Sequence, residues 1–152
     1  MEAQKDFIEN TLKKNFKITQ HSDIYAAVGK IIEAAQDWEQ DYKELAKKLK
    51  ADIKNVNKSS LNRLNIKLHK ENKLTKKEYD DLAKVIDLRN YINHVFFLEI
   101  KRKKMSYEEI GKKLSDILFL IQEADDVVCN KIDALKGSSI IRPTVFDEDN
   151  KK

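Results

Sequence analysis

Apolar residues recur every three or four positions along most of this 152-residue chain, which is the period of an α-helix that buries one face. The pattern predicts four main helices, at about 2–16, 22–49, 75–101 and 106–135, and a short helix at about 59–71. Because short loops join them, consecutive helices are expected to pack side by side in opposite directions. We therefore expect an all-α fold, an antiparallel up-and-down bundle that forms a single domain over residues 1–137.

Residues with the chemistry of helix caps stand before most of these segments. Ser, Thr and Asp side chains accept hydrogen bonds from the free backbone N–H groups at a helix start. A Glu placed three residues later completes a capping box. The candidates are Ser22 or Asp23, Ser59 or Ser60, Thr75 with Glu78, and Ser106 with Glu109.

The C-terminal residues 138–152 follow a predicted helix stop at Gly137 and contain Pro143 and a charged end. We expect them to form a mobile tail. Docking of the tail on the bundle surface is the alternative, and the apolar residues available for it are Ile140, Ile141, Val145 and Phe146.

Composition agrees with an all-α fold, since only three Gly and one Pro interrupt the chain. Lys and Arg outnumber Asp and Glu by 30 to 26, and the net charge of +4 is compatible with nucleic-acid binding without requiring it. The single cysteine, Cys129, excludes an internal disulfide framework and favours a cytoplasmic setting. No apolar run approaches the ~18 residues that span a bilayer, and residues 1–6 lack the layout of a signal peptide, so we expect no membrane partner.

The predicted helix 75–101 carries polar residues on the face that its apolar pattern assigns to the core. At 100° per residue, Arg89 and Asn93 fall near the middle of the apolar face of helix 75–101, and Asn90 and His94 lie at its edge. Polar groups on a buried stripe cost free energy unless they are paired or used. Such a conflict between pattern and fold is expected at functional sites, so these polar residues are the candidate site.

The chemistry of these residues suits cleavage of an RNA phosphodiester. The chain has no glycine-rich phosphate loop, no His and Cys spacing suited to zinc and no repeated Glu-x-x-His, so we expect no metal and no cofactor. A histidine can accept or donate a proton near neutral pH, and an arginine can stabilise charge that grows on phosphate oxygens. A single helix supplies one such set. We therefore expect a symmetric homodimer, formed through the motif helix, that brings two sets together.

The sequence from Arg89 to His94, RNYINH, resembles the motif of the HEPN superfamily: an arginine usually followed by asparagine, then a histidine a turn or more later. The aromatics Phe96 and Phe97 that follow also fit, and the resemblance covers about residues 24–135. It implies a dimeric, metal-independent endoribonuclease with Arg89 and His94 as catalytic residues and Asn90 as their support. Such enzymes often act as toxins or in defence against phage, and they leave a cyclic phosphate end.

Further residues are assigned on the same resemblance. Asn93 and the basic run at the end of the motif helix are expected to support RNA binding; the run is Lys101, Arg102, Lys103 and Lys104. Some family toxins carry a tyrosine, modified by a partner nucleotidyltransferase, where this chain has Phe96. Some members also place an acidic residue on an earlier helix, and the candidates here are Glu33, Asp37 and Glu39.

Plainer interpretations of the motif stay open. Arg89 could form an ion pair with an acid of helix 22–49, Asn93 an interhelical hydrogen bond, and His94 could be a satisfied core histidine. The whole domain could then be a non-catalytic HEPN-like module that dimerises or binds a protein partner, or a nucleotide-binding adaptor. An antitoxin protein is the further partner that a toxin implies. For the basic cluster at Lys47, Lys48 and Lys50, a solvated helix end is favoured over RNA contact.

Overall fold

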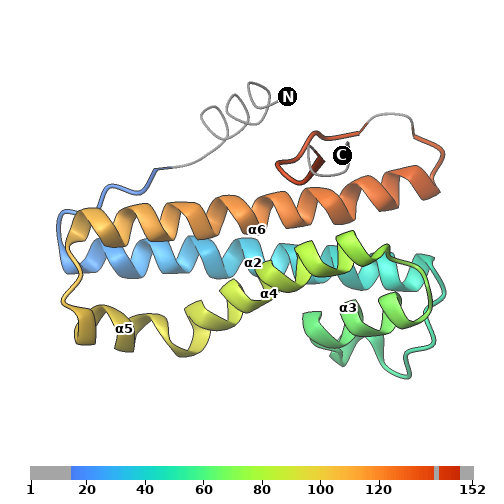
Figure 1. Ribbon diagram of the computed structural model, residues 1–152, viewed down its shortest axis with the longest axis horizontal. Coiled ribbons are helices and arrows are strands. Elements are labelled where there is room, and N and C mark those ends of the chain that lie inside the picture. Colours follow the sequence, from blue (N-terminus) through green and yellow to red (C-terminus); the bar gives the residue numbers. More distant parts are fainter. Residues whose placement is uncertain (1–14, 139–140, 148–152) are drawn as a thin grey trace.

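A computed structural model describes residues 15–138 and 141–147, and in these ranges all regular secondary structure is helical, as predicted (Figure 1). The elements are α2 (His21–Lys48), the 3-10 turn η1 (Val56–Lys58), α3 (Leu61–Lys70), α4 (Lys76–His94), α5 (Phe96–Lys103) and α6 (Tyr107–Leu135). The first predicted helix, at 2–16, lies outside the described residues apart from Asn15 and Phe16, which are not helical. None of the described helices is long and apolar enough to cross a membrane.

The two long helices α2 and α6 lie side by side and run in the same direction (Figure 1). Helix α4 runs in the opposite direction to α6. Near its start, Glu78 contacts Lys131 late in α6 at 2.8 Å, whereas near its end Tyr91 lies under Lys113 early in α6. Direction therefore alternates from α2 to α4 to α6.

The core follows the predicted apolar stripes. In α2 the buried positions include Ile24, Val28, Ile31, Ala35, Trp38, Tyr42 and Leu45, all of them expected from the sequence. A buried polar link joins three elements: Tyr42 donates to Asn65 Oδ1 of α3 at 2.5 Å, and Asn65 Nδ2 donates to the Tyr79 carbonyl of α4 at 3.2 Å. Each polar atom in this link has a hydrogen-bond partner, so its burial leaves no unpaired polar group. The link therefore fixes the position of α3.

Helix starts agree with the predicted caps at three of four places. Ser60, Thr75 and Ser106 each accept the backbone N–H three residues on. The prediction for the second helix is wrong by two or more residues, because Gln20 is the N-cap of α2. Asp23 instead takes the third position of a capping box, where its carboxylate accepts the backbone N–H groups of Thr19 and Gln20.

The predicted helix 75–101 is not continuous. It ends at His94 and resumes as α5, because Val95 has φ −123° and ψ −34°, outside the helical region. The chain turns at this point (Figure 1). The turn lets Phe96 enter the core with no exposed surface, while the ring of Phe97 stacks on Tyr25 of α2 at 5.3 Å. Packing of the two aromatics thus overrides the helical pattern.

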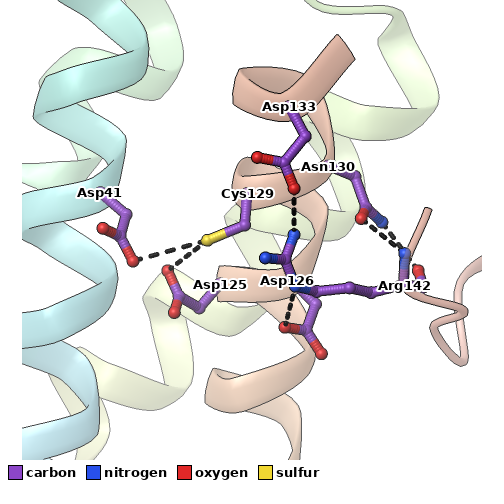
Figure 2. A network of polar contacts seen from close by, with 7 residues as sticks. All are labelled: Asp41, Asp125, Asp126, Cys129, Asn130, Asp133 and Arg142. Atoms are coloured by element: carbon purple, nitrogen blue, oxygen red, sulfur yellow. Dashed lines mark hydrogen bonds and ion pairs between the residues drawn. The ribbon is translucent and has the colours of Figure 1, made fainter. Parts of the chain in front are cut away.

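Part of the C-terminal segment lies along α6 (Figure 2). The guanidinium of Arg142 contacts Asp133 at 2.7 Å, and its backbone N–H and carbonyl both pair with the Asn130 side chain at 2.8 Å. Val145 is buried and its N–H donates to Glu123 of α6 at 3.2 Å. Val145 and Phe146 therefore dock, which was the alternative to a mobile tail, whereas Ile141 is exposed and Ile140 lies outside the described residues.

Candidate functional site

The RNYINH motif occupies the last two turns of α4, so that His94 is the final helical residue before the turn at Val95. After the motif the chain bends and continues as α5 (Figure 1). The C-terminal end of α4 lies at this bend. The motif therefore lies at a helix end and not in the middle of a continuous helix.

Arg89 is held by an acid from another helix. Its Nη2 donates to Glu39 Oε2 of α2 at 3.3 Å, and the two side chains are 27% and 21% exposed. Of the acids proposed from the sequence, Glu33, Asp37 and Glu39, the structure therefore selects Glu39. Glu39 also lies 3.6 Å from Lys43 one turn on. The guanidinium keeps further N–H donors for a ligand, because among the described residues only Nη2 donates a hydrogen bond, to Glu39.

The other polar residues of the motif are not on a buried stripe. Asn90, Asn93 and His94 are all exposed, so the expectation that Asn93 lies in the middle of a buried face is wrong. The same holds for the interpretations of His94 as a core histidine and of Asn93 as an interhelical bridge. The helical spacing placed Asn93 on the apolar face, but in the structure Asn93 is exposed in the last turn of α4, next to the buried Ile92. No hydrogen bond within the described ranges joins Arg89 to His94.

Tyr91, Glu99 and Lys113 form a brace, a set of contacts that links three helices beside the motif. The sequence analysis did not identify these contacts. Lys113 of α6 lies over the ring of Tyr91 at 4.6 Å and pairs with Glu99 of α5 at 3.0 Å. The hydrogen bond from Lys113 lowers the pKa of Glu99, and burial raises the pKa of Tyr91. One lysine thus ties α4, α5 and α6 together and fixes the bend beside His94. No sequence signal marks it, because its partners are distant along the chain.

Exposed apolar side chains border the motif. Val95, which follows His94 directly, is 46% exposed, and Leu98, four residues after His94, is 63% exposed. Tyr25, which is 57% exposed, reaches the same region through its stacking on Phe97. These three exposed apolar side chains are candidates for an interaction surface beside the motif.

The predicted basic run is solvent-facing. Lys101, Arg102, Lys103 and Lys104 are all exposed, and within the described residues Lys103 pairs with Glu99 at 3.5 Å. Lys104 ends α5 in the left-handed conformation, with φ 48°. These charges lie on and just after the helix that follows the motif, and they face solvent. Phe96, by contrast, is fully buried, so its position offers no accessible group for modification.

A separate polar cluster joins α2 to α6 (Figure 2). The ligand atoms of Asp41, Asp125 and Cys129 lie within 4.8 Å of one another, the closest approach to a metal-binding arrangement in the part of the chain described. Burial, then the neighbouring carboxylates, raises the pKa of the Cys129 thiol to about 12 and the pKa of Asp125 well above its usual range. The thiol is therefore protonated at neutral pH and is not a nucleophile.

Comparison of the chain with protein-family models, with curated proteins and with solved structures gives no match.

Proposed function

We propose that the protein is a metal-independent endoribonuclease of HEPN type, with Arg89 and His94 as catalytic residues and Asn90 as their support. The observation that carries the proposal is the placement of the motif. His94 and Asn90 face solvent at a helix end, and Arg89 is oriented by Glu39 from a second helix. Alternation of α2, α4 and α6 supports a HEPN-like antiparallel bundle as the scaffold.

The proposed reaction needs only side-chain chemistry. The ribose 2′-OH attacks the adjacent phosphorus, the bond from phosphorus to the 5′-oxygen breaks, and a 2′,3′-cyclic phosphate and a 5′-OH result. Imidazole accepts the 2′-OH proton or donates one to the leaving oxygen. The guanidinium of Arg89 stabilises the charge on the non-bridging oxygens. Asn90, one turn before His94, orients the imidazole or donates to the phosphate.

A homodimer through the motif face completes the site in this proposal. The reaction moves two protons, and one chain contributes a single motif histidine. The exposed apolar residues beside the motif, Tyr25, Val95 and Leu98, supply the surface on which a second copy would pack. Asn93 and the basic run of α5 would then line the path of the RNA. Such an enzyme fits a cytoplasmic toxin or phage-defence component with an antitoxin partner.

Incubation of purified protein with mixed RNA in excess chelator tests the proposal. Wild-type protein should cleave, and His94→Ala and Arg89→Ala should each lower the rate at least about 100-fold, the lower end of the range for loss of one acid–base or charge-stabilising group. His69→Ala is the matched control, since His69 lies on α3 and stacks on Tyr79, outside the motif. Cleavage that survives both motif substitutions, or that fails in a folded His69→Ala variant alone, places the activity elsewhere.

A second candidate is a non-catalytic interaction module that uses the same face. The ion pair of Arg89 with Glu39 favours it, because a structural role accounts for the arginine without any substrate. This candidate predicts no RNA cleavage, and a change in assembly when Arg89 is substituted.

A further inference from the structure

Positive charge is concentrated at the far end of α4 from the motif, where α2 ends and α3 packs (Figure 1). Residues 47–73 contain nine Lys or Arg and two acidic residues, a net charge of +7, although the whole chain carries only +4. The remainder of the chain is therefore net acidic. Such segregation creates a local field that attracts polyanions far more strongly than the overall charge suggests.

A cavity of about 510 Å³ lies within this region, between residues 52–54 and α3. Four of its lining residues are cationic, Lys54, Arg63, Lys67 and Lys70, and one, Asp52, is acidic. Arg63, Lys67 and Lys70 are four and three residues apart, so they share one face of α3. The cations thus line one wall of the cavity in a row along the helix axis.

Most of this charge is not neutralised by the protein. Glu71, one of the two acids in the region, already pairs with Lys73 at 3.0 Å and Lys67 at 3.6 Å, and it accepts the Asp52 N–H. Among the described residues Lys54, Arg63 and Lys70 have no ion pair. Cations held together without counter-charges repel one another, and an anionic ligand relieves that repulsion.

Favourable interaction with helix dipoles explains only some of the positive charges in residues 47–73. Positive charge complements the negative end of a helix, which accounts for Lys47 and Lys48 in the last turn of α2 and for Lys70 in the last turn of α3. Arg63 lies in the first turn of α3, where a cation opposes the dipole, and Lys54 lies in a loop. A solvated helix end therefore does not account for this cavity.

We propose that the cavity formed by residues 52–54 and α3 binds the phosphate backbone of single-stranded RNA, as a contact surface separate from the motif. The inference deepens the proposed function and rests on it for the identity of the polyanion. A polymer is favoured over a small phosphate ligand because further cations flank the lining residues along the chain, at Lys47, Lys50 and Lys58. The lining has no aromatic side chain on which a base could stack, so binding is expected to depend on phosphates and not on sequence.

Fluorescence anisotropy in excess chelator tests whether the cavity binds RNA. The probe is a labelled oligouridylate of about 20 nucleotides, a length that spans several backbone contacts. The protein carries His94→Ala, so that binding is measured without cleavage. At about 0.1 M salt each lost phosphate contact is worth roughly fivefold, so Lys54→Ala, Arg63→Ala and Lys70→Ala together should weaken binding about 100-fold and reduce the salt slope by about 2. Lys30→Ala, Lys84→Ala and Lys112→Ala together remove the same charge from exposed positions elsewhere and should weaken binding less than about threefold.

The outcomes separate this inference from the proposed function. Equal weakening by both triple variants, with circular dichroism showing that both are folded, overturns the inference, as does displacement of the oligonucleotide by an equal concentration of uridine monophosphate. Selective weakening by the cavity variant supports it even if wild-type protein cleaves no RNA. Cleavage that needs His94, with binding indifferent to the cavity, supports the proposed function and overturns this inference.

Discussion

Arg89 and Glu39 form the contact that sets the geometry of the motif. The pair joins the end of α4 to the middle of α2, fifty residues away in the chain. Both side chains are more than half buried, so the pair is screened less than a surface salt bridge, although it is not fully desolvated. Its main consequence is orientation, since a guanidinium with one nitrogen fixed can still present the others to a phosphate.

Breaking this pair should affect activity more than stability. Glu39→Gln should lower the free energy of unfolding by about 0.5–1 kcal/mol, the value of a partly exposed pair. Arg89→Gln added to it should cost little more stability, because the interaction is already lost. Urea unfolding of the two single variants and the double variant measures this cycle. Independent, additive losses would show that the pair is not coupled.

The glycines of the two long helices give a matched test of local packing. A Cβ at Gly111 of α6 would lie 2.8 Å from the Phe16 carbonyl oxygen, whereas a Cβ at Gly29 of α2 would meet nothing within 4 Å. Gly111→Ala should therefore destabilise the protein by about 1–3 kcal/mol. Gly29→Ala should stabilise it by about 0.5–1 kcal/mol through helix propensity. Thermal unfolding followed by circular dichroism distinguishes them, and shifts of the same sign would contradict the packing of residue 16 on α6.

At the level of elements, the C-terminal segment is joined to α6 through a buried acid. Glu123 is 2% exposed, and burial raises its pKa to about 7. A carboxyl whose folded pKa is raised stabilises the fold below its unfolded pKa, and this contribution is lost as the pH rises through about 7.

Glu123→Gln should therefore leave stability nearly unchanged at low pH and raise it at high pH. The amide oxygen still accepts the Val145 N–H and carries no charge to bury. The gain should grow between the ordinary Glu pKa and the raised one, and reach about 1–3 kcal/mol at the alkaline side, at 1.36 kcal/mol per pKa unit. Unfolding free energies across this range measure it. A gain that does not change with pH would rule out titration of Glu123 as its cause.

The elements themselves were largely predictable, because amphipathic period and capping residues are local features. Thr75 with Glu78 marked the start of α4, and the stripe of α2 was predicted almost residue for residue. The turn at Val95 was not predictable, since it depends on where Phe96 and Phe97 find partners on other helices. For the same reason the choice of Glu39 among three acids, and the brace formed by Lys113, needed the fold.

For the molecule as a whole, the proposed site requires a second copy of the chain to pack on the motif face. Light scattering coupled to size exclusion should give twice the mass of one chain. Leu98→Glu places a charge on this face and should yield a monomer that has lost cleavage, because an unpaired charge is costly in an apolar interface. Leu135→Glu is the control, since Leu135 is 51% exposed at the end of α6. Dimers that persist in Leu98→Glu and dissociate in Leu135→Glu would place the interface elsewhere.

The chemistry of the products tests the proposed cleavage mechanism. Wild-type protein in excess chelator is incubated with an RNA and with the same sequence bearing 2′-O-methyl groups, and the new ends are identified by mass spectrometry. Only the RNA should be cleaved, its fragments should end in 2′,3′-cyclic phosphate, and His94→Ala should form them at least about 100-fold more slowly. Cleavage of the methylated strand, or no cleavage of RNA by a folded dimer, would contradict this mechanism.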